Sequence, residues 1–314
     1  MGASLSLLVG LSWSAVYILL ESAQSVFFGA VLQEMDSFHL GFWVFGITTL
    51  FLILGLSVFD PVQIRLCARN LPGLAACNGS TAAGWIFYLF SIQLIEPAVA
   101  FTVSSAAMPI FAIGLARLGI GEPVSLDTGR KRIGLLLIVA GILFLAGSTI
   151  VGLSGFVRGT QAAGIAGLAC AALSGGAFAL MLVHCKTLND NGLGPVSVFA
   201  FRFLAYIALS AFGWLLKLDY KGPVEAGDAA TAILIGLVIM AFPLFAMQKA
   251  ISSISVLLLS TITALGPLVV FCMQIVEGRV GLSGFTLAGL LTYSVGALLT
   301  VFSLVRDDQG ALPS

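Results

Sequence analysis

The stretch RIGLLLIVAGILFLAGSTIVG, residues 132–152, decides the fold class of this chain. Arg132 at its first position is the only charged residue, and apolar or small residues fill the rest. A helix that crosses the hydrocarbon core of a bilayer needs about 20 mostly apolar residues, whereas a membrane barrel strand needs about ten alternating ones. Because the apolar run is continuous rather than alternating, it predicts a transmembrane helix.

The composition of the whole chain agrees with a membrane protein. Of the 314 residues, 59% are hydrophobic and 9% are charged, against about 45–50% and about 25% in ordinary globular proteins. So few charged residues could not cover the surface of a soluble protein of this size. Most of the surface of this protein must therefore face hydrocarbon. The zero net charge without a basic cluster argues against a nucleic-acid partner.

The cysteines and histidines predict no metal or disulfide chemistry. The five cysteines stand far apart without a CxxC pair, and the chain has only two histidines. A disulfide framework or a structural zinc site would need closer spacing. We therefore expect no metal ion and no cofactor.

Glycine, proline and charged residues divide the chain into ten apolar runs. The first run lacks a basic segment before it and is too long for a cleaved signal peptide, so it is read as a retained span. No connection between runs is long enough for a soluble domain. The predicted spans are about 5–30, 40–59, 72–94, 97–118, 132–152, 162–184, 196–216, 229–250, 253–276 and 282–304.

The positive charges of the connections predict the orientation. With the N-terminus in the cytoplasm, most Lys and Arg residues of the connections also fall on the cytoplasmic side, as the positive-inside rule requires. We expect a multi-pass protein of the bacterial inner (plasma) membrane with both termini cytoplasmic.

The chain repeats itself at an offset of 155 residues. Leucine matches are common between apolar sequences, but polar and glycine matches in one register are not. The alternative is a chance alignment of two hydrophobic stretches. The matching pairs are Gln93/Gln248, Glu122/Glu277, Gly129/Gly284, Gly134/Gly289 and Gly141/Gly296.

A real repeat gives each half five spans, and an odd number turns the second half upside down relative to the first. The predicted fold class is therefore an all-α membrane protein with ten transmembrane helices in two inverted five-helix repeats, a common plan among secondary transporters. The expected domains are the first repeat at 1–152, a short outer linker at 153–160, the second repeat at 161–305 and a cytoplasmic tail at 306–314.

This pattern resembles the EamA-type drug/metabolite transporter superfamily over nearly the whole chain. The resemblance rests on Gln93 to Gly141 with Pro109, on Gln248 to Gly296 with Pro267, and on FAFRFLA at residues 199–205. In the second span, Gly46 and Ile47 stand where that pattern would have an arginine. The resemblance implies a drug/metabolite transporter-like fold and the export or exchange of amino acids, nucleotide conjugates or other small metabolites. It does not identify the substrate.

Glu21 is the first candidate site residue, because ionisable groups within spans are costly and usually face the protein interior or water. Tyr17, Glu21 and Gln24 share one helix face with Ser14. A polar stripe on an apolar helix predicts a cavity wall. The alternative is that Glu21 lies near enough to the outer surface to be merely solvated.

A second stripe follows in the third span. Asn78, Thr81, Trp85 and Tyr88 share one helix face, and their dipoles and rings suit a small amphipathic ligand. The alternative is interhelical hydrogen bonding by Asn78 and Thr81 with the aromatic rings as packing.

Arg202 and Tyr206 form a third stripe, near the cytoplasmic end of the seventh span. Arg202 could bind a substrate carboxylate, pair with an internal acid or reach the interface. Since the resemblance implies an arginine here for varied substrates, a structural or gating role is favoured.

The turns and prolines supply further gating or structural candidates. Glu122 and Glu277 precede the last helix of each half. Pro243 and Pro267 free backbone carbonyls within spans and permit kinks.

The favoured function is a secondary active transporter of an amino acid or similar amphipathic solute, working by alternating access as an exporter or exchanger. No ATP-binding loop of the GxxxxGK[ST] kind is present, so the expected partners are the bilayer, a small-molecule substrate, and a proton on Glu21 or a counter-substrate. A homodimer is left open. The alternatives are a passive facilitator or channel and, less favoured, a membrane-embedded enzyme, for which no HExxH or GxSxG motif appears.

Overall fold

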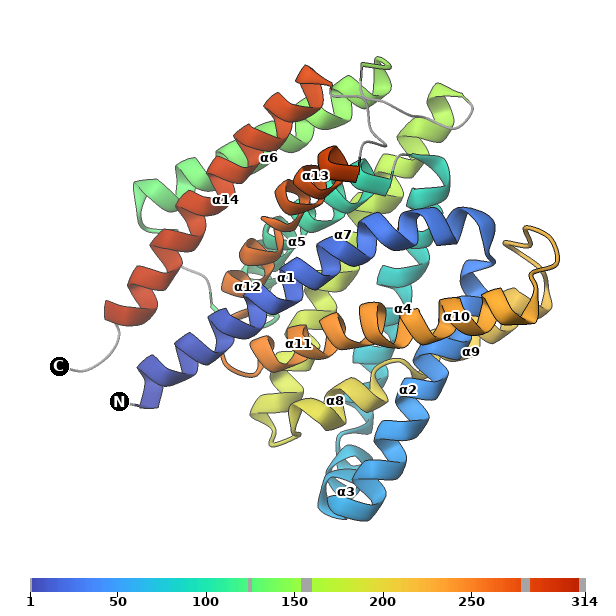
Figure 1. Ribbon diagram of the computed structural model, residues 1–314. Helices are drawn as coiled ribbons and strands as arrows, with labels where there is room; N and C mark the ends of the chain where they lie inside the picture. The colour runs from blue at the N-terminus through green and yellow to red at the C-terminus, as the bar shows by residue number, and fades with distance from the viewer. Residues whose placement is uncertain (1, 96, 124–125, 154–159, 278–282, 311–314) are drawn as a thin grey trace.

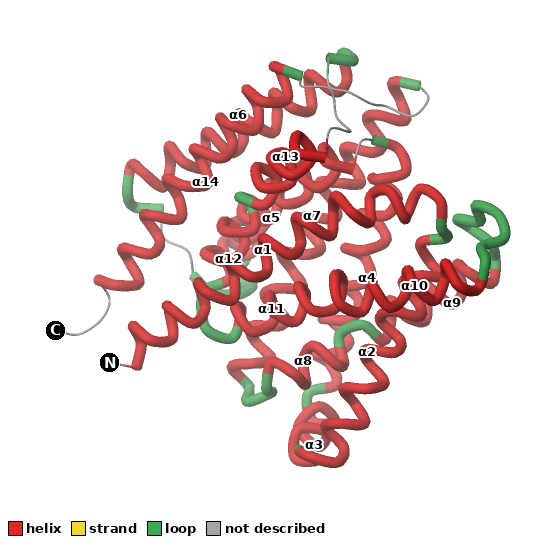
Figure 2. The backbone as a smooth tube through the Cα atoms, viewed as in Figure 1, coloured by secondary structure: helices red, strands yellow, loops and turns green. Residues whose placement is uncertain are grey.

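The computed structural model describes residues 2–95, 97–123, 126–153, 160–277 and 283–310. Within these ranges the chain folds as helices and short connections, without a strand (Figures 1 and 2). The helices of the first half are α1 (Gly2–Glu34), α2 (Ser37–Phe59), α3 (Pro61–Arg69), α4 (Leu71–Leu94), α5 (Pro97–Arg117) and α6 (Gly129–Ile150). Those of the second half are α7 (Gln161–Asp190), α8 (Pro195–Phe201), α9 (Leu204–Leu215), α10 (Ala226–Gly236), α11 (Phe242–Ile251), α12 (Val256–Thr263), α13 (Gly266–Glu277) and α14 (Gly284–Gly310).

The predicted all-α membrane fold is confirmed, but the count of ten spans is not. In the described part of the chain, nine helical segments are long and apolar enough to cross a membrane. The predicted span at 72–94 is the exception: it forms α4, which has 24 residues but carries the polar and small residues Asn78 to Thr81. Because α4 packs against α5, α7 and α9, part of its surface does not need to be apolar.

Three of the predicted spans contain a backbone irregularity. The seventh breaks between α8 and α9 at Arg202 and Phe203. In the eighth, a π-helical turn at Leu237–Ala241 precedes Pro243, and in the ninth α12 ends before Pro267. Proline removes a backbone donor and clashes with the preceding turn, which explains the last two irregularities. The gating role predicted for Pro243 and Pro267 stays a prediction.

The helices that enclose the site form two groups. We call α4, α5 and α7 the first bundle, because these helices pack closely on one another. We call α1, α11, α12 and α13 the second bundle, in which α1 packs on α11 and α13. Helices from both halves of the chain therefore occur in each bundle, since α7 joins the first and α1 the second (Figure 1).

The glycines of the repeat bring α6 and α14 together. A methyl group added at Gly141 of α6 would lie 2.6 Å from Cβ of Tyr293 on α14. One added at Gly289 of α14 would lie 2.7 Å from Cγ of Leu145 on α6. Real side chains avoid such distances, so glycine permits the close approach of the two helices seen in Figure 1.

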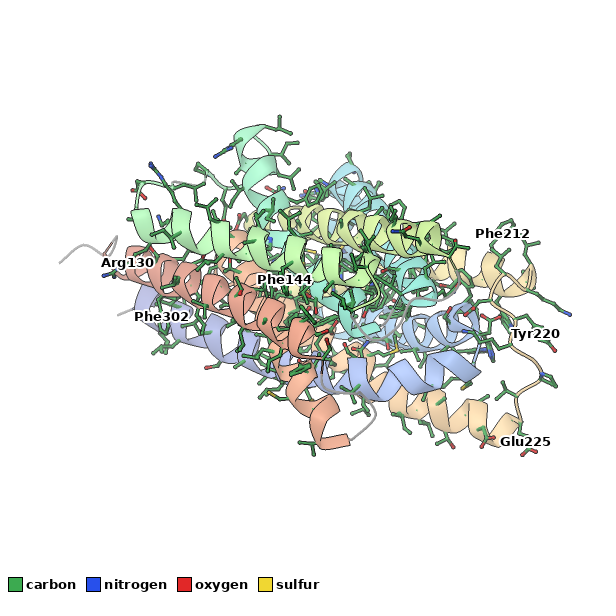
Figure 3. All side chains as sticks on the ribbon, turned by 90° about the horizontal axis from the view of Figure 1, so that it is seen from above. Arg130, Phe144, Phe212, Tyr220, Glu225 and Phe302 are labelled. Atoms are coloured by element: carbon green, nitrogen blue, oxygen red, sulfur yellow. The ribbon has the colours of Figure 1, made fainter. Side chains whose placement is uncertain are left out.

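The outer surface has the polarity of a membrane protein. Viewed from above, Arg130 lies at one end of the molecule and Tyr220 and Glu225 lie at the other (Figure 3). Between these ends the flank exposes large apolar side chains such as Phe144, which is 45% exposed, and Phe302, which is 70% exposed. Exposed aromatic side chains of this kind match a hydrocarbon environment. The chain is a multi-pass integral membrane protein.

The predicted domain borders fall in short connections. Residues 154–159 of the predicted linker lie outside the described residues, and Thr160 caps the start of α7. α14 continues through the start of the predicted tail to Gly310. The borders themselves stay predictions.

Candidate functional site

A cavity lies where the two bundles face each other. The space not filled by atoms is about 520 Å³, counted together with the part that is open to the surroundings. Helices of both bundles line it, and Arg202 reaches it from the break between α8 and α9. The lining residues are Tyr17, Glu21, Trp85, Tyr88, Phe101, Ser104, Ser105, Met108, Phe178, Met181, Arg202, Leu244, Met247 and Thr263.

α1 supplies the acidic wall of the cavity. Tyr17 and Glu21 lie on one face of the helix, as their spacing predicts. Gln24 is buried one turn further on; with its amide nitrogen turned toward the carboxylate, it donates to Glu21 Oε2 at 3.3 Å and to the Ile239 carbonyl at 3.1 Å. Gln24 therefore supports Glu21 from behind and does not line the cavity.

α4 and α7 supply an aromatic wall. The rings of Trp85 and Tyr88 meet edge to face with their centroids 6.1 Å apart, and Trp85 meets Phe178 in the same way at 5.8 Å. Edge-to-face contacts hold such rings in defined orientations. The wall thus offers rigid apolar surface to the non-polar part of a solute.

The break in the seventh predicted span places Arg202 in the bundle interior. Asn78 of α4 bridges this break: its Nδ2 donates to the Phe201 carbonyl at 2.7 Å, and the Ala205 amide donates to its Oδ1 at 3.0 Å. Backbone groups freed by a broken helix must find partners away from water. Asn78 provides these hydrogen-bond partners. Its role is therefore the interhelical hydrogen bonding that the sequence analysis gave as the alternative to ligand binding.

Arg202 is 1% exposed and is held mainly by neutral groups. Its Nη1 donates to Gln248 Oε1 at 2.9 Å, and its Nη2 lies 3.4 Å from the Leu244 carbonyl. The rings of Phe199 and Phe203 lie 5.2 Å and 4.8 Å from its Cζ, within the range of cation–π attraction. Aromatic faces and carbonyls stabilise the guanidinium without neutralising it.

The structure brings five of the nine predicted cavity residues together and places the other four behind the wall. Tyr17, Glu21, Trp85, Tyr88 and Arg202 line the cavity. Gln24 and Asn78 lie outside it, as described above. Thr81 also lies outside, and its hydroxyl donates to the Cys77 carbonyl of its own helix. The fourth is Tyr206, whose ring centroid lies 5.9 Å from that of Trp85. Whether the five lining residues bind substrate stays a prediction.

Several lining residues were missed in the sequence. Ser104 and Ser105 of α5 form a polar pair within an apolar helix, a signal that could have found them. Met108 and Thr263 are 155 residues apart, so they occupy equivalent positions in the two halves of the repeat, and both line the cavity. The other lining Phe, Met and Leu side chains resemble packing residues, and nothing in their spacing marks them.

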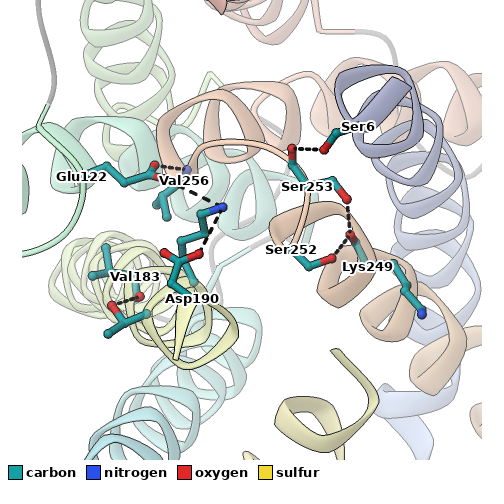
Figure 4. Close-up of polar contacts among 10 residues, drawn as sticks. Ser6, Glu122, Val183, Asp190, Lys249, Ser252, Ser253 and Val256 are labelled. Atoms are coloured by element: carbon teal, nitrogen blue, oxygen red, sulfur yellow. Dashed lines mark hydrogen bonds and ion pairs between the residues drawn. The ribbon is translucent and has the colours of Figure 1, made fainter. Parts of the chain in front are cut away.

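Glu122 connects the two bundles (Figure 4). It belongs to the α5–α6 connection, which lies toward the end of the molecule that carries the termini (Figure 1). From the α5–α6 connection, its Oε2 accepts a hydrogen bond from the Val256 amide at the start of α12, at 3.0 Å. Its Oε1 lies 4.0 Å from Lys186 Nζ on α7. A carboxylate suits the unpaired amides and positive dipole end at a helix start. We call the bond between Glu122 and Val256 the latch.

Glu277, the repeat counterpart of Glu122, ends α13. In Figure 1 this end of α13 lies away from the termini. The side chain of Glu277 lies outside the described residues, so its predicted role stays untested.

The fold and the cavity define the class of protein: an all-helical, multi-pass membrane protein with a largely apolar cavity among its helices that also holds a carboxylate and a guanidinium. The model of the EamA-like transporter family matches residues 1–147 of this chain. This match confirms the resemblance to the EamA-type superfamily, and residues beyond 147 lie outside it.

A structural similarity covers nearly the whole chain. A crystal structure, described only as that of a protein, matches with a TM-score of 0.70 at 18% sequence identity, covering 96% of this chain and 98% of its own. At that identity the match shows a shared fold only. No curated protein matches the sequence of this chain.

Proposed function

We propose that the protein is a secondary active transporter that moves a small amphipathic solute through this cavity by alternating access. The observation that carries the proposal is the cavity itself, which lies between two bundles and, among the described residues, is lined by one acid, Glu21, and one base, Arg202. Ionisable groups within membrane helices are costly and mark substrate or ion pathways.

The packing of the helices supports an inverted repeat. If the halves are equivalent, α4 is the counterpart of α11, α5 that of α13, and α7 that of α1. Each contact in one bundle should then have a counterpart in the other: α4 with α7 matches α11 with α1, and α5 with α7 matches α13 with α1. All four contacts occur. Exchanging the halves also converts the first bundle into the second. We therefore propose α4 as the tenth span and two inverted five-helix repeats.

Alternating access would proceed by rocking of one bundle against the other. The latch must break when the bundles separate at the end that carries the termini, because it joins the α5–α6 connection to α12. Inverted repeats allow the opposite movement at the other end. The cavity would then open to one side at a time.

The lining favours an amino acid or a similar solute with an apolar body. Trp85, Tyr88 and the methionines offer apolar contact, and Glu21 and Arg202 offer opposite charges to its polar end. We propose export or exchange across a bacterial inner membrane, with both termini in the cytoplasm, driven by a proton on Glu21 or by a counter-substrate.

Solute counterflow in proteoliposomes tests this function. Vesicles containing the purified protein and a high internal concentration of unlabelled L-leucine, L-methionine or L-phenylalanine should transiently accumulate the same labelled solute from outside, because a carrier exchanges bound molecules one for one. Saturation and overshoot are expected for at least one of these solutes. Linear, non-saturating flux would support the passive facilitator instead, and no flux with any of them would contradict the proposed substrate class.

A further inference from the structure

Arg202 carries a buried charge that the protein does not directly neutralise. In the described part of the chain, no Asp or Glu oxygen forms an ion pair with it within 4.0 Å. Glu21 lines the same cavity but makes no such contact. A buried cation without a direct counter-charge is costly, and an anion that enters the cavity would remove part of that cost.

Two donors beside the cavity also lack partners. Arg202 Nε and Gln248 Nε2 are buried without a hydrogen bond to any described residue. The orientation of the Gln248 amide follows from chemistry: the guanidinium can only donate, so Oε1 must face Arg202 and Nε2 must point elsewhere. Gln248 is fully buried next to the lining residue Met247. Buried donors are rarely left unpaired in proteins unless another partner binds there.

Building on the transport function proposed above, we infer that Arg202 is the subsite for a carboxylate of the substrate and that Gln248 positions it. The neutral Oε1 of Gln248 accepts a hydrogen bond from Arg202 Nη1, so Gln248 orients the planar guanidinium without neutralising its charge. Asn78 fixes the backbone on both sides of Arg202. The guanidinium is therefore preorganised for an oxygen anion, at little further cost in side-chain entropy.

A carboxylate fits better than a phosphate. A phosphate group carries about −1.5 to −2 charges at neutral pH, whereas Arg202 is the only Lys or Arg among the described lining residues. Glu21 would also repel a doubly charged group. One guanidinium matches one carboxylate in charge and in geometry, and the aromatic and methionine surface suits an apolar body attached to it.

Binding to the full-length protein in detergent tests this assignment without transport. The probes are L-leucine, L-methionine and L-phenylalanine, each compared with its carboxamide, which keeps the ammonium and the side chain but lacks the carboxylate. We expect at least one free acid to raise the Tm, since a ligand of the folded state stabilises it. Its carboxamide should bind at least about tenfold more weakly, as expected for a lost charge-assisted hydrogen bond.

Gln248→Glu separates this role from a structural one. The glutamate keeps the size and the oxygen facing Arg202 but supplies the counter-charge, so Arg202 should no longer attract an external carboxylate. We expect the affinity for the free acid to fall at least about tenfold, with the weak affinity for the carboxamide unchanged and the Tm without ligand preserved. Gln248→Met, which removes the positioning bond but adds no charge, should weaken acid binding less than Gln248→Glu does.

Equal binding of acid and carboxamide would overturn the assignment, as would unchanged acid binding in Gln248→Glu or a lack of stabilisation by every free acid. These outcomes are distinct from failure of the transport proposal. Counterflow of solutes that lack a carboxylate, without competition by the free acids, would leave the transporter standing and remove the carboxylate subsite. Acid binding that depends on Gln248 but is never followed by counterflow would support the carboxylate subsite and contradict the transport proposal.

Discussion

Glu21→Gln is expected to lower concentrative transport at least about tenfold, because the variant loses a charge that lies in the cavity wall. Glutamine has nearly the same size and can still accept a hydrogen bond from Gln24, so folding and insertion should be retained. The measurement is accumulation of labelled solute in proteoliposomes with an imposed pH gradient. Glu225→Gln is the matched control, since Glu225 is an exposed carboxylate at one end of the molecule (Figure 3).

The same variant distinguishes the two proposed roles of Glu21. If Glu21 carries the coupling proton, solute counterflow should survive in Glu21→Gln while accumulation against a gradient is lost. If Glu21 binds a cationic part of the solute, binding itself should weaken and counterflow should fall as well. A Glu21→Gln protein that binds, accumulates and responds to pH like the parent would mean that Glu21 serves neither role.

Cross-linking the latch is expected to reduce transport to about a tenth or less, since a carrier must separate its bundles to release solute. The variant carries Glu122→Cys and Ser255→Cys in a background in which the five native cysteines are replaced. Ser255 adjoins Val256, the residue whose amide Glu122 binds, and it is partly exposed. A short cleavable thiol cross-linker should join the two positions, and counterflow measured before and after cleavage should be lost and then restored.

A second cross-link controls for general rigidity. Ser6 and Ser253 are close in the same region, where the Ser6 hydroxyl lies 3.3 Å from the Ser253 carbonyl (Figure 4). Both belong to the second bundle or to its connections, so Ser6→Cys with Ser253→Cys can be joined without tying the bundles to each other. Counterflow should survive this cross-link. Full activity of the protein with a cross-linked latch would show that this end does not open.

Much of the architecture could be predicted from hydrophobicity alone. Long apolar runs gave helix positions close to those observed, because a bilayer leaves few alternatives to the helix. The break between α8 and α9 escaped prediction because no proline or glycine marks Arg202 and Phe203. Helix α3 also escaped, since nine residues after Asp60 read as a polar connection.

The site could be predicted only where polar groups stood out from the apolar background. Glu21 and Arg202 were visible because charges are rare in spans, whereas Met108 and Met247 resemble any core residue. The stripe from Asn78 to Tyr88 is about 15 Å long at 1.5 Å per residue, so one end faces the cavity and the other faces the break beside Arg202. The partner of Glu122 could not be predicted, since Val256 is 134 residues away and contributes only a backbone amide.

The central claim is that one cavity opens to each side of the membrane in turn, and Ser105 offers the most direct test. Ser105 is small, 3% exposed, and lines the cavity from α5. In Ser105→Cys without other cysteines, a membrane-impermeant thiol reagent should react from either side of the vesicle, and a transported solute should slow both reactions. In the same protein with added Glu122→Cys and Ser255→Cys and the latch cross-linked beforehand, reaction should persist only from the side opposite the termini. Equal reaction from both sides despite the cross-link, or reaction from one side only without it, would contradict alternating access through this cavity.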